Sequence, residues 1–429
     1  MEKAKLVRAQ GNWVSGDRFW DREIELELLI ESLEEGANLL IVAMRRIGKT
    51  SLMREASRRI EDRFLCLHID LQKAHSAADA IVELSFAIKP YNSLWGKVTG
   101  MFSNILDTIA NRVDSIGPDD LKVALRSGLN AGNWQAKGDH LFEVLAASDL
   151  PVVIFFDEVP ILVNRLLKGA DYQITPERRQ EADAFLSWLR ANSIRHAGKV
   201  RQVVTGSIGL EPILRQGGLT ANLNNFAPFE LGPWTPEVTA GCIHALANQY
   251  NLSFQEGSAQ RITERLGYCV PHHVQMFFSN VYRICRERKL QQVSPELIDE
   301  VYQNSMLSVR GRAELSHMEE RLKMVLGPEI YPLALELITE ASFTGHLTAE
   351  TAEILSRAYS FESRNSGDVM REILSVLEHD GYMRADEDNT YRFISLLLKD
   401  WWKARFGFKP ASERKEERHG SDSGKLTVS

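Results

Sequence analysis

The sequence lacks the features of an exported, membrane-spanning or disulfide-linked protein. No run reaches 18 apolar residues, and the N-terminal stretch MEKAKLVRAQGNWVSGD has no apolar core of the kind that a signal peptide needs. The four cysteines among 429 residues are scattered without C-x-x-C spacing, which argues against a zinc site or a disulfide framework. We therefore expect a cytoplasmic protein with reduced thiols.

Positive charge is also in short supply. The chain carries 51 Lys and Arg against 58 Asp and Glu, for a net charge of −7. This excludes a protein that coats nucleic acid without selectivity, although a local basic patch can exist within an acidic total. Hydrophobic and charged fractions of 44% and 25% are those of ordinary globular proteins, and the length suits two or three domains.

Short apolar runs rich in β-branched residues alternate with helical stretches from about residue 38. This pattern indicates a parallel sheet flanked by helices. Four runs are almost continuously apolar, as expected of strands buried on both faces: NLLIVAM, RFLCLHIDL, LPVVIFFDE and KVRQVVTGS. Apolar spacing predicts a helical insertion at about residues 89–140, with a polar break at SIGPDD. We therefore predict an α/β core over residues 1–231.

Helical periodicity replaces these runs after FELGPW. It predicts a helical domain over residues 232–311. In residues 312–408, three helices are followed by the β-like runs YMRADED and TYRFIS and a final helix, which is the order of a winged helix. Residues 409–429 are polar and lack large apolar groups, so we expect a disordered tail.

The stretch LLIVAMRRIGKTSL, residues 39–52, is similar to the phosphate-binding loop G-x-x-x-x-G-K-[ST], with Ala43 in place of the first glycine. A helix follows, and its N-terminus offers unpaired N–H groups and a positive dipole end to phosphate oxygens. We expect Lys49 to bridge the outer phosphates and Thr50 to join a Mg²⁺ shell. Ala43 is tolerated if its φ is negative and strained if it is positive. The residues expected at the nucleotide are Ala43, Arg45, Arg46, Ile47, Gly48, Lys49, Thr50 and Ser51.

Two adjacent carboxylates, Asp157 and Glu158, end the third apolar run. Acids at the end of a buried strand are costly unless they bind something, such as a metal ion and an attacking water. We assign Asp157 to Mg²⁺ and Glu158 to the role of general base. The alternative is that they cap and open the next helix, because Pro160 follows closely.

The fourth run ends in Thr205, Gly206 and Ser207. Ligands of open α/β sheets bind at the carboxyl ends of strands, so Thr205 or Ser207 is expected to contact the γ-phosphate or the lytic water. An ordinary turn at the end of the strand is the alternative. The serine-hydrolase pattern G-x-S-x-G is excluded because Gly206 directly precedes Ser207.

With these motifs in this order, the sequence resembles the archaeal-type ATPases of the STAND branch of P-loop NTPases, which are close in architecture to AAA+ proteins. The resemblance covers about residues 14–406 and is carried by FWDRE, RRIGKTSL, FFDEVP, VVTGSIGL, GYCVPHHVQ and LEHDGYMRADEDNTYRFISLLLKDWW. It implies a parallel-sheet P-loop NTPase core, a helical lid domain and a winged-helix domain. It also implies that ATP and Mg²⁺ are bound and hydrolysis occurs; with Ala43 in the loop, we expect slow turnover.

The resemblance assigns further residues. In the family, an F-x-G-R-E segment lies against the adenine; here Asp21 replaces its glycine, and Arg22 is the residue carried over. A G-x-P motif of the lid faces the nucleotide in similar proteins, and its counterpart GYCVP is one residue longer and ends at Pro271. His272 follows where an AAA+ protein has a second-sensor arginine. Arg215 is placed as an arginine finger acting on a neighbouring subunit, in competition with Arg195 and Arg201.

Three functions are consistent with the sequence. The first is an ATPase switch that drives oligomerisation of the chain or signals to a separate effector protein. The second is a DNA-binding ATPase of the loader or transposition-regulator type that uses the winged helix. The third helix of that domain opposes the second function, because four acids accompany one arginine and would repel phosphates. The third function is a nucleotide-binding scaffold with little turnover, motivated by Ala43 and the missing second-sensor arginine.

Overall fold

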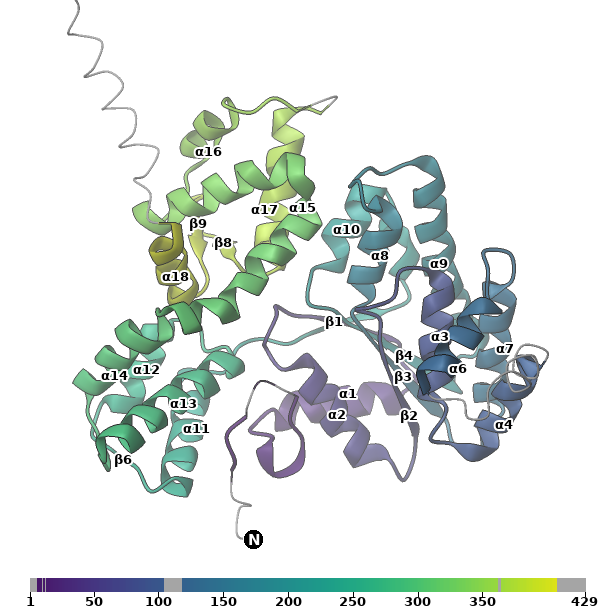
Figure 1. The fold of residues 1–429 in the computed structure, drawn as a ribbon, viewed down its shortest axis with the longest axis horizontal. Coiled ribbons are helices and arrows are strands. Elements are labelled where there is room, and N and C mark those ends of the chain that lie inside the picture. The colour runs from purple at the N-terminus through teal and green to yellow at the C-terminus, as the bar shows by residue number, and fades with distance from the viewer. Residues whose placement is uncertain (1–5, 10, 12, 104–117, 362–363, 407–429) are drawn as a thin grey trace, which may run out of the picture. The chain divides into compact units, whose positions relative to one another are not determined.

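We describe the protein from a computed structural model (Figure 1). The described residues are 6–9, 11, 13–103, 118–361 and 364–406. The chain forms two compact units, one of Trp13–Leu231 and one of Met1–Asn12 together with Gly232–Ser429. Among the described residues, no helix is both long and apolar enough to cross a membrane.

The unit Trp13–Leu231 is built on a parallel sheet whose described strands follow the order β2-β3-β4-β1-β5. The strands are β1 (Leu39–Val42), β2 (Leu65–Asp70), β3 (Val152–Asp157), β4 (Val200–Val204) and β5 (Ala227–Glu230). The four predicted strands are confirmed. Sequence analysis missed β5, because its residues APFE are largely exposed and include a proline, so they lack the apolar run of a buried strand.

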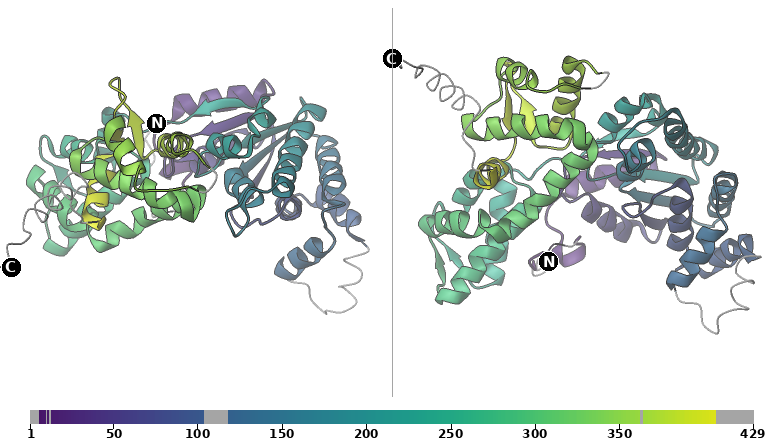
Figure 2. Two further views of the ribbon diagram at one scale, coloured as in Figure 1. Left: turned by 90° about the horizontal axis from the view of Figure 1, so that it is seen from above. Right: turned by 45° about the horizontal axis from the view of Figure 1, so that its top comes forward.

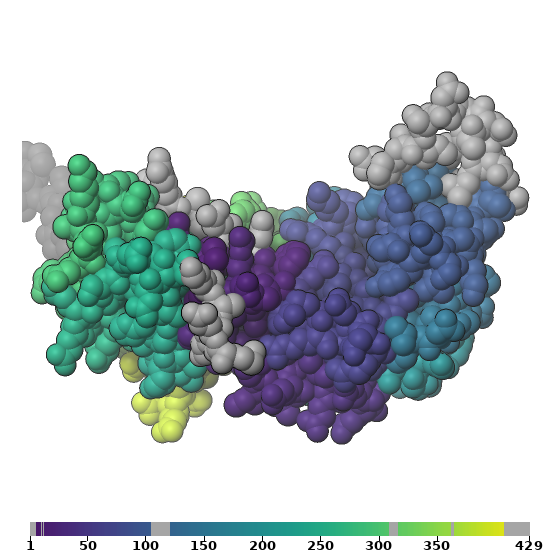
Figure 3. Space-filling view, turned by 90° about the horizontal axis from the view of Figure 1, so that it is seen from below, coloured from purple at the N-terminus to yellow at the C-terminus, as the bar shows by residue number. Residues whose placement is uncertain are grey.

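Helices cover both faces of this sheet. Figures 1 and 2 show α1 and α2 on one face and α8 and α10 on the other. The described helices are α1 (Glu23–Glu34), α2 (Lys49–Ile60), α3 (Ala77–Ala87), α4 (Asn92–Met101), α6 (Pro118–Ser127), α7 (Trp134–Ala146), α8 (Val159–Lys168), α9 (Pro176–Arg195) and α10 (Leu210–Gly217). In the space-filling view, the surface of the N-terminal helices (purple) is continuous with that of the neighbouring segment (indigo) (Figure 3).

The predicted insertion at about residues 89–140 is helical where the structure describes it. It contains α4, α6 and the first half of α7. The second half of the predicted break at SIGPDD is helical, because α6 begins at Pro118 within it, and proline is favoured in the first turn of a helix. The rest of the predicted helix LWGKVTGMFSNILDTIANRV, beyond residue 103, lies outside the described residues.

After residue 231, the second unit has two parts, one from α11 to a π-helix and one from α15 to α18. Its first elements are α11 (Pro236–Gln249), β6 (Ser253–Phe254), α12 (Ser258–Leu266), α13 (Pro271–Arg288), β7 (Gln292–Val293), α14 (Pro295–Val301) and a π-helix (Tyr302–Met306). The later elements are α15 (Val309–Thr344), α16 (Ala349–Ser356), α17 (Ser366–His379), the antiparallel pair β8 (Met383–Ala385) and β9 (Tyr391–Phe393), and α18 (Leu396–Phe406). The helix α15 is interrupted at Gly327, whose backbone is not helical. Its part after the kink, α16, α17, the hairpin and α18 follow the order that the sequence predicts for residues 312–408, and the helix before the kink was not predicted.

The two parts of this unit are joined through α18. The Tyr302 hydroxyl, in the π-helix, donates a hydrogen bond of 2.8 Å to the Asp400 carboxylate. Gly267, at the end of α12, packs so closely on Leu396 that a Cβ would lie 2.7 Å from its Cγ. The two contacts connect the helical part of this unit to the last helix, although Leu396 itself is largely exposed.

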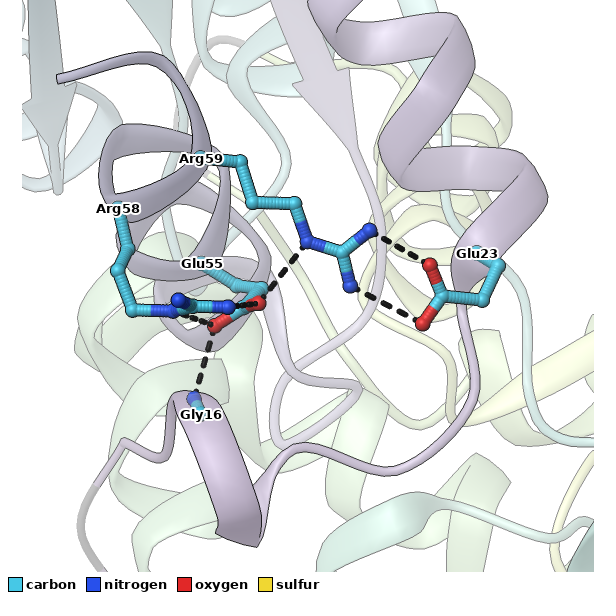
Figure 4. Close-up of polar contacts among 5 residues, drawn as sticks. All are labelled: Gly16, Glu23, Glu55, Arg58 and Arg59. Carbon is cyan, nitrogen blue, oxygen red and sulfur yellow. Dashed lines mark hydrogen bonds and ion pairs between the residues drawn. The ribbon is translucent and has the colours of Figure 1, made fainter. Parts of the chain in front are cut away.

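A charged cluster ties the N-terminal segment to α2 and α1 (Figure 4). Glu55 is buried, and its carboxylate accepts hydrogen bonds from the Gly16 N–H at 2.8 Å, from Arg58 and from Arg59. Arg59 also pairs with Glu23 at 2.6 Å. Burial alone would raise the pKa of Glu55, but the hydrogen bonds outweigh it and hold this pKa to about 2. The carboxylate is therefore ionised whenever the chain is folded near neutral pH.

We predict that Glu55→Gln lowers the free energy of unfolding at pH 7 by about 2 kcal/mol, because hydrogen bonds to an ionised group are lost. The folded pKa of Glu55, about 2, lies below its ordinary value of 4.5. Its contribution is therefore complete above pH 4.5 and disappears as the pH falls toward 2. Urea unfolding between pH 3 and 7 measures this, with Glu27→Gln, an exposed acid on α1, as the control. A deficit that is unchanged at pH 3 would contradict the prediction.

Candidate functional site

The backbone of the loop that joins β1 to α2 shows whether Ala43 is strained. The left-handed positions of the loop are Arg46, with φ of 67°, and Gly48, with φ of 105°, whereas Ala43 has no positive φ. Space is open where a Cβ of Gly48 would lie, so its φ rather than crowding favours glycine there. Alanine at position 43 is thus accommodated without backbone strain.

Lys49 and Thr50 open α2 with their side chains in different directions. Lys49 is buried, and its ammonium group donates to the carbonyl oxygens of Ala43 at 2.8 Å and Met44 at 2.9 Å. The Thr50 hydroxyl donates to Oδ2 of Asp157 at 2.8 Å. The structure therefore brings the start of α2 and the end of β3 together, as the motifs predict. A hydroxyl and a carboxylate oxygen side by side are oxygen ligands of the kind that Mg²⁺ takes.

Negative charge is concentrated at the carboxyl end of β3. The parallel register pairs Asp157 with Asp70 of β2, and Glu158 follows in the chain. Burial, and next the charge of Glu158, raise the pKa of Asp157 from 3.8 to about 6, although the Thr50 hydrogen bond and Lys49 lower it. A bound cation would relieve both the burial cost and the repulsion. Thr50 and Asp157 thus fit a divalent cation, and Asp70, which was not predicted from the sequence, adds negative charge nearby. Within the described ranges no group of three or more potential metal ligands occurs.

The side chain of Glu158 does not cap α8, the helix that follows it. It occupies the N-cap position of α8 with a left-handed φ of 62°, but its side chain makes no capping hydrogen bond. Instead, its carboxylate Oε2 accepts the N–H and the hydroxyl of Ser207, each at 2.9 Å. The helix-cap alternative thus describes the position of Glu158 in the chain but not its side chain. A left-handed glutamate is strained, and such strain is concentrated at functional sites.

Gly206 and Thr205 shape the end of β4. A Cβ on Gly206 would lie 2.4 Å from Pro160, so only glycine allows this strand end to approach α8. The Thr205 side chain is fully buried, and its hydroxyl lies 3.5 Å from the Ile41 carbonyl oxygen of β1. Of the two hydroxyls predicted here, it is therefore Ser207 that contacts Glu158, while Thr205 contacts the sheet backbone.

The FWDRE segment approaches the loop from its outer side. Asp21 has a φ of 57°, which explains why a glycine can stand at this position and why aspartate, tolerant of left-handed backbone, can replace it. Arg22 is buried, pairs with Glu25 at 2.6 Å and directs Nη2 at the Ile47 carbonyl oxygen, 3.5 Å away. Arg22 therefore contacts the backbone of the loop, and its predicted position against the adenine stays a prediction.

Other predicted residues are positioned as follows. The Ser51 hydroxyl accepts the N–H of Val14 at 3.0 Å and so anchors the N-terminal segment. Arg45 and Arg46 are half-buried within the loop. Pro271 begins α13, followed by His272, whose ring lies 6.0 Å from that of His273. These two residues belong to the second unit, so their approach to the nucleotide stays a prediction.

Three arginines were candidates for a finger. Arg201 is buried and donates to the Leu33 carbonyl oxygen at 2.8 Å near the amino end of β4, so it cannot reach a neighbouring subunit, and we withdraw it as a competitor. Arg195 pairs with Asp139 at 3.1 Å. Arg215, on α10, is exposed and pairs with Glu211 within its own helix. Because a pair within an exposed helix is weak, Arg215 is free to exchange partners.

Comparisons with known proteins identify the fold of the chain. No known family model and no curated protein sequence matches the chain. Among solved structures, a Walker-type ATPase of Pyrococcus abyssi matches with a TM-score of 0.60 and 14% identity over 91% of this chain and 98% of that one. The ORC2 protein of Aeropyrum pernix, in ADPNP and ADP complexes, matches with a TM-score of 0.51 and 13% identity over 90% and 94%. The chain thus has the fold of an archaeal Walker-type, AAA+-like P-loop ATPase.

The raised pKa of Asp157 leads to a prediction about the chain without nucleotide. Since its folded pKa is about 6 and its ordinary value 3.8, the ionised carboxylate destabilises the fold increasingly as the pH rises from 4 to 6. Asp157→Asn should therefore stabilise the chain at pH 7 by up to about 3 kcal/mol, with the gain vanishing near pH 4. Thermal unfolding in EDTA measures this, with the exposed Asp17→Asn as control. Destabilisation at pH 7 would contradict it.

Proposed function

We propose that the chain binds Mg-ATP and hydrolyses it slowly, as a switch that drives oligomerisation or signals to a partner protein. The observation that carries this proposal is the contact of Thr50 with Asp157 beside Lys49 and Glu158, at the carboxyl edge of β1 and β3. The solved ORC2 neighbour was obtained with ADPNP and ADP, which supports an adenine nucleotide as the ligand.

The chain's own residues divide the work. Lys49 would exchange the carbonyl oxygens of Ala43 and Met44 for phosphate oxygens, which are stronger acceptors because they are charged. Thr50 and Asp157 would hold Mg²⁺, which neutralises charge on the phosphates when bound. Glu158 would accept the proton of the attacking water, and Ser207 would fix its carboxylate in place.

A switch requires that a change of the bound nucleotide alter the conformation of another part of the chain. We expect Pro271 and His272 to respond to the nucleotide and the joined helical parts of the second unit to move together, because Tyr302 and Asp400 connect them. A winged-helix arrangement of α15–α18 would then present the change to a second copy of the chain or to a separate effector protein. Arg215 is our candidate for the finger offered to a neighbouring copy.

The two alternatives gain less support. DNA binding would need a basic third helix, but α17 and its C-cap carry four acids and one arginine, and the Arg371 guanidinium is already paired with Asp368. A scaffold without turnover was motivated partly by Ala43, whose backbone is unstrained. No described feature favours either alternative over the ATPase switch.

We predict that Lys49→Ala abolishes measurable ATP binding, because the phosphates lose their principal cation. Glu158→Gln should bind ATP with wild-type affinity yet hydrolyse it about 100-fold more slowly, the usual contribution of a general base. Calorimetry for binding and phosphate release for turnover test both variants. The control is Lys199→Ala, an exposed lysine before β4 at the opposite edge of the sheet. Wild-type ATP turnover by Lys49→Ala would refute the proposed function.

Ser207 provides a separate test of how Glu158 is positioned. Ser207→Ala removes the hydroxyl but keeps the backbone N–H that also donates to Glu158. We expect kcat to fall about tenfold with ATP affinity unchanged, because one charge-assisted hydrogen bond of the base is lost. Ser207→Thr, which keeps a hydroxyl, should restore most of the rate. An equal loss in both variants would mean that the side chain acts through packing alone.

A further inference from the structure

A cavity of about 860 Å³ lies in the unit Trp13–Leu231, on the face of the sheet that carries α2. Its walls come from α2, the outer strand β2, α4 and residues 147–150, and we call it the β2 pocket. Neither Lys49 nor Asp157 lines it. Its size falls in the range of pockets that bind small molecules.

Two cations of this pocket, Arg54 and Lys97, have no ion-pair partner among the described residues, although the charge of Asp157 attracts Arg54. In the described parts of the chain, neither Arg54 nor Lys97 has an ion pair or a side-chain hydrogen bond, and Nε of Arg54 is buried without an acceptor. Trp13 stacks on the Arg54 guanidinium, whose Cζ lies 5.0 Å from the ring centre. A buried, unpaired guanidinium nitrogen is costly, and an anionic acceptor would offset that cost.

The remaining charged groups around the pocket do not supply such an acceptor. Arg58 already pairs with Glu55. The two acids that line the pocket, Glu61 and Asp149, are exposed to solvent. Carboxylates in that setting are well solvated and attract the half-buried Arg54 only weakly.

The floor of the pocket is polar but uncharged. His68 stacks on Phe155 of β3 with ring centres 4.7 Å apart, and its Nε2 lies 2.7 Å from the Ser57 hydroxyl oxygen. Burial, and next the positive charge of Arg54, lower the pKa of His68 to about 3, while burial raises the pKa of the Cys66 thiol to about 11. At neutral pH both groups are therefore neutral, and they neither repel nor replace an anion beside Arg54.

We propose that the β2 pocket binds a small organic anion, whose phosphate or carboxylate group is held by Arg54 and Lys97 and whose flat part lies against Trp13. Ser57 and His68 would hydrogen-bond its neutral polar groups. This site is distinct from the phosphate loop and goes beyond the proposed ATPase function. Arg and Lys side chains hold phosphate and carboxylate groups through charge-assisted hydrogen bonds. Here they come from α2 and α4, and Trp13 beside Arg54 adds an aromatic surface.

The experiment titrates the full chain by calorimetry with three probes: inorganic phosphate, pyrophosphate and citrate. We expect saturable binding of at least one probe, with its Kd raised about tenfold in Lys97→Gln and in Arg54→Gln, because each removes one charge-assisted contact. Preference for phosphate and pyrophosphate would identify a phosphorylated ligand, and preference for citrate a carboxylate. Lys89→Gln, an exposed lysine that does not line the pocket, is the matched control.

A fourth variant separates the two sites. Binding in the β2 pocket should persist in Lys49→Ala, whereas probe binding in the phosphate loop should be lost there and be indifferent to Lys97→Gln. The inference is overturned if no probe saturates, or if binding follows Lys49 and ignores Lys97. Because Lys97 is exposed, its substitution leaves the fold intact and keeps the test decisive even if Arg54→Gln unfolds. None of these outcomes depends on whether the chain hydrolyses ATP.

Discussion

The hydrogen bond between Thr50 and Asp157 is the contact on which the rest of the site depends. It joins the first turn of α2 to the last residue of β3, two elements about a hundred residues apart in the sequence. Next to this contact, the parallel register of β2 and β3 places Asp70 beside Asp157, and the turn after β3 brings Glu158 to Ser207. The carboxyl edge of the sheet thus becomes a cluster of acids that a cation can stabilise.

The residues of the candidate site lower the stability of the fold. A raised pKa of Asp157 and a left-handed Glu158 are both unfavourable to the isolated fold. They are maintained by the buried strands β3 and β4 and by Gly206, which lets β4 approach α8 closely. A well-packed sheet can tolerate local strain of this kind because the surrounding contacts leave no alternative conformation.

Much of the fold could be predicted, because its strongest signals are local. Apolar runs revealed four strands, and the order of the motifs indicated that Thr50 and Asp157 lie close together, as they do. The sequence could not predict features that depend on contacts between distant segments. Strand β5 carries no apolar signal of its own and is fixed by pairing with β1. The choice of Ser207 over Thr205, and the burial of Arg201, depend on which way side chains point after the sheet forms.

Lys49 also stabilises the conformation of the loop between β1 and α2. Its ammonium group satisfies the carbonyl oxygens of Ala43 and Met44 and so acts as an internal ligand of the loop. The two hydrogen bonds therefore give the loop a defined shape. Under the proposed function, binding and release of a nucleotide would exchange acceptors at one ammonium group, and the helix that begins there would not have to refold.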